Sequence, residues 1–304
     1  MRNHLPTLRV AADNRPLNRL INICNATRSV AKPAVAALAL AAVAFAAACG
    51  SPIQTSVSAG TDPPSNYPLT LVESREHRET MSAEWTRLFE AHGVPVERRR
   101  VPELTPVLHT PQSILGIGPI RLGTSAAGSL DDAGIRLLLR KFIADYSQLL
   151  GVAPSTLSLE GVTTAGGLGN RYTFTQNGFA HPIAPPAGRL EFTVSPAGEL
   201  IQMSVTTIPL AELPEPRLTR ATAGERVIGT TFTYGDKRGA PQTVTVSDPA
   251  QVVVKRLVVY PHQTESTVAI RLCWEVEAGD GMTWTVFVDA ITGQIVGTVQ
   301  NFQT

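Results

Sequence analysis

The sequence has few cysteines and lacks the motifs that usually accompany catalysis. Only Cys24, Cys49 and Cys273 occur in 304 residues, so a disulfide-stapled scaffold is excluded. No His-Glu-x-x-His zinc motif and no Gly-x-Ser-x-Gly nucleophile turn is present. These absences argue against a metallopeptidase and against a serine hydrolase.

A strong charge of one sign is also missing. The whole chain has a net charge of +1, and residues 50–304 carry 20 basic and 24 acidic residues. Nucleic-acid affinity depends on neutralising phosphates, so we expect no nucleic-acid partner. The cluster Arg98 to Arg100 is interpreted as a solvated strand or loop face rather than a ligand site.

No apolar run is long enough to cross a bilayer. The longest, Pro33 to Ala48, has 16 residues and follows Arg28 and Lys32, whereas a spanning helix needs about 20. A basic stretch, a short apolar run and small residues before a break predict a secretory signal peptide over residues 1–48.

The end of this run, Ala46 to Gly50, reads Ala-Ala-Ala-Cys-Gly and resembles a bacterial lipobox. The resemblance implies that Cys49 receives a diacylglycerol and becomes the first residue of a lipoprotein, anchored to the outer face of a bacterial membrane in the cell envelope. The alternative is ordinary cleavage near Ala48, which leaves Cys49 free.

Residues 49–72 are rich in Ser, Pro, Thr and Gly, which predicts a flexible tether. From about residue 73 to 92 the spacing of Met81, Trp85, Leu88 and Phe89 predicts an amphipathic helix. A second helix is expected over 129–150, with Ser129 as its N-cap.

Alternating strands are expected at 170–176, 188–194 and 200–208, which completes a helix-over-meander unit at 73–210. After a proline-rich break, a second unit at 217–304 repeats the order of a helix followed by strands. The expected fold class is α+β, with two successive units in which a helix lies over an antiparallel meander.

The first unit resembles the fungalysin/thermolysin propeptide (FTP) motif through its helix at 137–151, its turn at 176–178 and its strand and turn at 189–201. The second resembles a PepSY domain through Leu272 to Val276 and Val286 to Gly293. The resemblance implies modules of the kind found in the propeptides of metallopeptidases, and we expect them here without a catalytic domain.

The last motif predicts a turn from the residues themselves. Asp289 can accept hydrogen bonds from backbone amides, and Gly293 can take the positive φ that reverses the chain, so Phe287 and Ile295 are expected on the core side of paired strands. This is a structural site and not a catalytic one.

The other candidates for chemistry have simpler interpretations. Glu76, His77 and Glu79 are typical of a salt-bridged helix face, and Cys273 is typical of a half-buried strand residue. The segment Gly116 to Gly123 lacks the spacing of a phosphate loop. We therefore expect no catalytic residue, no metal, no cofactor and no small-molecule substrate.

The leading hypothesis is a non-catalytic envelope lipoprotein of peptidase-inhibitor-like character. On this hypothesis it binds a protein partner and inhibits or chaperones a secreted metallopeptidase in trans. The alternatives are an envelope scaffold or cell-wall binding module, and an enzyme whose site the sequence does not reveal.

Overall fold

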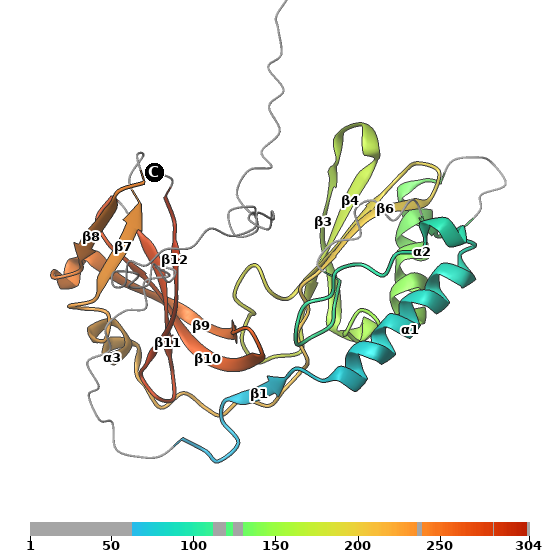
Figure 1. Ribbon diagram of the computed structural model, residues 1–304. Coiled ribbons are helices and arrows are strands. Elements are labelled where there is room, and N and C mark those ends of the chain that lie inside the picture. Colours follow the sequence, from blue (N-terminus) through green and yellow to red (C-terminus); the bar gives the residue numbers. More distant parts are fainter. Residues whose placement is uncertain (1–62, 112–119, 124–129, 236–238, 282, 303–304) are drawn as a thin grey trace, which may run out of the picture. The chain divides into compact units, whose positions relative to one another are not determined.

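The computed structural model describes residues 63–111, 120–123, 130–235, 239–281 and 283–302 (Figure 1). Within these ranges the chain forms three α-helices, twelve strands and four short 3-10 helices. All pairings between strands are antiparallel. The expected α+β class is therefore confirmed.

The first sheet has five strands in the order β2-β6-β5-β4-β3. Their bounds are β2 Ile120–Arg121, β3 Leu157–Thr164, β4 Asn170–Gln176, β5 Arg189–Val194 and β6 Glu199–Val205. The sequence predicts β4, β5 and most of β6, but β3 was not predicted. β3 is an edge strand whose residues are at most half-buried, so its apolar signal is weak.

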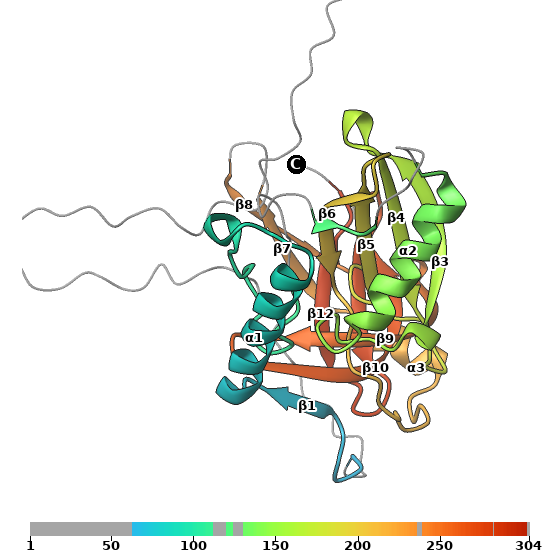
Figure 2. The same ribbon diagram turned by 90° about the vertical axis from the view of Figure 1, so that its right-hand side faces the viewer.

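Two helices, α1 (Arg75–Ala91) and α2 (Asp132–Asp145), pack against this sheet (Figure 2). Ser74 caps α1 by accepting the His77 N–H. The predicted stripe is confirmed, because Met81, Trp85, Leu88 and Phe89 are all buried in the same core. Aromatic side chains from α2, β4 and β5 complete that core.

Helix α2 is shorter than the expected 129–150. Its N-cap is Asp131, whose carboxylate accepts the Gly134 N–H at 2.8 Å, while the expected cap Ser129 lies outside the described residues. The helix ends at Asp145, and beyond it the Val152 N–H bonds to the Ser147 carbonyl in a wider turn. Leu149 and Leu150 remain buried in this turn, which explains why the apolar stripe continues past the helix.

The second sheet contains β1 Leu69–Val72, β9 Val252–Gln263, β10 Thr267–Ala278, β11 Trp284–Asp289 and β12 Ile295–Gln300. Helix α3 (Arg220–Glu225) and the hairpin of β7 (Thr231–Gly235) and β8 (Pro241–Thr245) share a core with it. Trp284 stacks on Phe232 of the hairpin, with ring centroids 4.8 Å apart.

Strand β1 corrects the expected tether at 49–72. Residues 49–62 of that tether lie outside the described residues, but Leu69–Val72 pair with Thr267–Ile270 of β10, and Tyr67 is buried. Four alternating residues after a proline-rich stretch are too short a pattern to predict a strand. The free edge of β10, which lies 200 residues away in sequence, makes this segment a strand.

Candidate functional site

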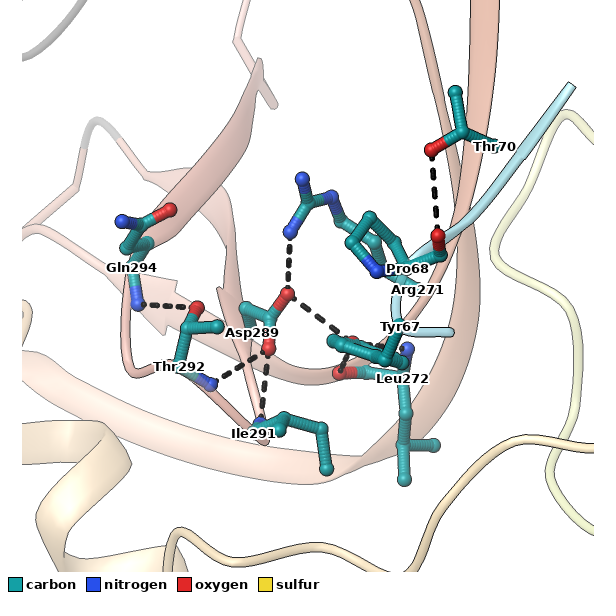
Figure 3. A network of polar contacts seen from close by, with 9 residues as sticks. All are labelled: Tyr67, Pro68, Thr70, Arg271, Leu272, Asp289, Ile291, Thr292 and Gln294. Carbon is teal, nitrogen blue, oxygen red and sulfur yellow. Dashed lines mark hydrogen bonds and ion pairs between the residues drawn. The ribbon is translucent and has the colours of Figure 1, made fainter. Parts of the chain in front are cut away.

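The turn after β11 is organised by the buried carboxylate of Asp289. Its Oδ1 accepts the backbone N–H groups of Ile291 and Thr292, each at 2.9 Å (Figure 3). The Gly293 N–H donates to the Asp289 carbonyl at 2.8 Å, and Gly293 has a φ of 73°. Both residues thus lie where a tight reversal between β11 and β12 needs an acceptor and a left-handed backbone.

The second carboxylate oxygen of Asp289 reaches two other elements. Oδ2 lies 2.7 Å from Nη1 of Arg271 on β10 and accepts the Tyr67 hydroxyl at 3.1 Å (Figure 3). Asp289 is 0% exposed and the Arg271 side chain is 17% exposed. A buried carboxylate needs such a partner, because an unpaired charge would lose its hydration without compensation.

Tyr67 fills the junction between two strands that share one edge of β10. Along this edge, β1 pairs with residues 267–270 and β11 pairs with residues 273–278. The Leu272 N–H, between them, donates to the Tyr67 hydroxyl at 3.0 Å, while its carbonyl accepts the Ala290 N–H. The hydroxyl thus replaces a strand partner where the ladder is interrupted.

The electrostatics of this network keep the Tyr67 hydroxyl protonated and do not favour proton transfer. Burial, and secondarily the charge of Asp289, raise the pKa of Tyr67 well above its usual value, so the phenol stays protonated. The network therefore acts as a clamp that holds the segment before β1 against the second sheet.

Cys273 lies beside this clamp and is completely buried. Burial, and secondarily Asp289, raise the pKa of its thiol above the usual value. A neutral thiol without solvent access is a poor nucleophile. Its role here is packing, together with Ala184, Val258 and Phe287.

The expectation that Phe287 and Ile295 share one core face is wrong. Phe287 packs with Tyr260 in one cluster, whereas Ile295 packs against the cluster that contains Val286 and Val288. A register shift between Phe287 and Val288 places Val288 opposite Ile295. Because side chains alternate along a strand, this bulge moves Ile295 to the other face.

The remaining candidates do not converge on a site. The rings of His77 and His109 contact each other in a tilted arrangement with centroids 5.1 Å apart, and Arg99 bonds to the Val94 carbonyl and to Glu90. In the described ranges, no group of three or more His, Cys, Asp or Glu residues could hold a metal ion. Residues 116–119, which are half of the segment Gly116 to Gly123, lie outside the described residues, as does Cys49.

No helix in the part of the chain that the structure describes is both long and apolar enough to cross a membrane.

Sequence reasoning placed Asp289 and Gly293 at the turn but missed Tyr67 and Arg271. The one available signal was the position of Tyr67, which together with Pro68 directly precedes the alternating residues Leu69 to Val72.

Comparison with known proteins gives little further guidance. No family model matches the chain, and no curated protein matches it. Among solved structures, the Bacillus megaterium YpeB C-terminal domain is similar over 66% of this chain and 76% of its own length, with 14% identity and a TM-score of 0.30. That likeness is too weak to define a family, so the fold assignment rests on the elements described above.

Proposed function

We propose that this chain is a non-catalytic envelope lipoprotein, anchored through Cys49, that binds a secreted metallopeptidase and inhibits it or assists its folding. The observation that carries the proposal is the order of motifs along the sequence, in which FTP-like segments precede a PepSY-like strand, turn and strand. The two α+β units, each with a helix and an antiparallel sheet, are compatible with propeptide-like modules.

The local geometry at the end of β11 supports the same proposal. Asp289 and Gly293 were singled out from the PepSY-like motif, and both contribute to one tight turn. A buried, hydrogen-bonded carboxylate in a rigid turn suits a folding determinant. It is unsuited to general acid–base work, which needs access to a substrate.

The peptidase partner is tested with the full-length chain and the thermolysin-like peptidases secreted by the same organism. We expect a complex in size-exclusion chromatography, together with slower peptide hydrolysis or a higher refolding yield of the peptidase. A secreted serine peptidase serves as the control and should show neither effect. Absence of a complex, of inhibition and of refolding help with every metallopeptidase would rule the proposal out.

The anchor is tested separately by metabolic labelling with an alkyne analogue of palmitate. We expect the label and the membrane fractionation to disappear in Cys49→Ser, with Cys273→Ser unaffected. Sedimentation with purified peptidoglycan distinguishes the alternative of a cell-wall binding module, because binding there without any peptidase partner would favour it.

A further inference from the structure

The pockets near Phe179 and near Pro102 have volumes of about 330 Å³ and 370 Å³. A third pocket, of about 590 Å³, lies between helix α2 and the edge strand β3. It combines an apolar floor, cationic side chains and an unpaired strand edge, and these three features together define a binding mode.

The floor of this α2–β3 pocket is apolar and rigid. Ile143 and Phe174 are 2% and 4% exposed and belong to the core of the first sheet, and the half-buried Leu157 and Leu159 pack against the same core. A preformed apolar hollow of this kind accepts a side chain without reorganising the protein.

The rim of the pocket carries two guanidinium groups. Arg136 and Arg140 lie one helical turn apart on α2, so they project from the same face. Arg136 pairs with Asp132 at 2.6 Å, but its Nε is buried without a hydrogen-bond partner in the described part of the chain. Arg140 is exposed and has no carboxylate partner among the described residues.

The third feature is the outer edge of β3. Among the described residues this strand pairs only with β4, with Leu157 opposite Gln176 and Ser158 opposite Thr175. The Asn177 N–H donates to the Thr156 carbonyl, so the backbone groups of Ser158 point towards β4. Those of Leu157 and Leu159 therefore point away from the sheet.

At this edge, one donor and two acceptors are available to a new strand. The Leu157 N–H is already bonded to the Pro154 carbonyl, which leaves the Leu157 carbonyl and the N–H and carbonyl of Leu159 directed outwards. An extended peptide can bond to these groups, as in recognition by strand addition, where pockets for alternate side chains provide the specificity.

We propose that the α2–β3 pocket binds an extended acidic peptide segment, which adds to the edge of β3. An apolar side chain of the peptide occupies the floor, and a carboxylate of the peptide pairs with Arg140 and Arg136. The occupant is expected to be acidic, because the nearby carboxylates of Asp132 and Glu160 are already paired with Arg136 and Arg189. Arg140 is therefore left with a positive charge that a carboxylate of the peptide can neutralise. The site deepens the proposed function, because it supplies the surface by which a protein partner would be held.

The test uses the full-length chain and a fluorescein-labelled octapeptide in which glutamate alternates with valine. A lysine–valine octapeptide is the matched probe. We expect saturable anisotropy binding of the acidic peptide only, and slower amide hydrogen exchange at Leu159 in its presence. The variant Arg140→Gln should weaken binding about fivefold, whereas the neighbouring exposed Lys141→Gln should change it less than about twofold.

Three results would overturn the site: no binding of the acidic peptide up to about 1 mM, equal binding of both peptides, or equal effects of Arg140→Gln and Lys141→Gln. Binding of phosphatidylglycerol vesicles in place of the peptide would also overturn it, because the ligand would then be a lipid surface. If a metallopeptidase binds equally well to Arg140→Gln, the site fails and the proposed function stands. If the peptide binds and no metallopeptidase does, the site stands and that function fails.

Discussion

Arg271 Nη1 and Asp289 Oδ2 lie 2.7 Å apart in the second sheet, with the carboxylate completely buried. The arginine comes from the middle of β10 and the aspartate from the last position of β11. The same carboxylate accepts the Tyr67 hydroxyl and two turn amides. One side chain therefore joins β10, the turn after β11 and the segment that precedes β1.

Removing this carboxylate should destabilise the fold strongly. Asp289→Ala leaves Arg271 unpaired and the turn amides without an acceptor, so we expect a loss of about 3–5 kcal/mol in the free energy of unfolding. Asp289→Asn should cost less, because the amide oxygen can still accept from Ile291 and Thr292. Urea denaturation measures both. Equal losses in the two variants would contradict the separate roles of the two oxygens.

Tyr67→Phe should release β1 while leaving the rest of the sheet intact. The substitution removes the acceptor of the buried Leu272 N–H, which costs about 1–3 kcal/mol. We expect faster amide exchange over Leu69–Val72. Tyr234→Phe is the control, since the Tyr234 hydroxyl has no hydrogen bond in the described residues and its ring contacts are kept. Unchanged exchange in Tyr67→Phe would rule out the clamp.

Substitutions of Gly293 test whether the turn after β11 requires a left-handed backbone conformation. Its φ of 73° predicts that Gly293→Ala costs about 1–2 kcal/mol and that Gly293→Asn costs less. Gly167→Ala is the comparison, because a Cβ there meets open space and no left-handed φ is required. Thermal unfolding of the three variants checks the order. Equal stability of Gly293→Ala and Gly167→Ala would contradict it.

His109 should make the fold sensitive to acid. It is completely buried, and burial lowers its pKa below the usual value of 6.5, with His77 and Arg78 adding to the effect. The unfolded chain then takes up the proton at higher pH than the folded chain does. Stability is therefore undiminished above pH 6.5 and decreases as the pH falls towards the folded-state pKa, by up to about 1.4 kcal/mol per pH unit.

His109→Asn removes this titration, and asparagine tolerates the φ of 52° at position 109. We expect a flatter dependence of the free energy of unfolding on pH below 6.5, measured by urea denaturation across the range. His262, whose pKa burial also lowers, leaves a residual slope. If the pH profile of His109→Asn runs parallel to that of the original protein, the assignment to His109 is refuted.

Local patterns predicted the elements whose periodicity is strong and whose partners are close in sequence. The stripe from Met81 to Phe89 predicted α1, and the alternation at 170–176 predicted β4 without error. The bulge between Phe287 and Val288 could not be predicted in this way, because a single extra residue leaves the apolar composition unchanged and alters only the face that each side chain meets.

The sequence by itself determined the α+β class, the main helices and the acceptor and glycine of the last turn, because each depends on neighbours within a few residues. Only the tertiary structure decided that Leu69–Val72 is a strand, that Tyr67 bonds to Leu272 and that Arg271 neutralises Asp289. These contacts join residues up to 222 positions apart. Such contacts form only when folding brings a distant strand edge or a buried charge next to the segment. The residues near the segment in sequence do not encode these contacts.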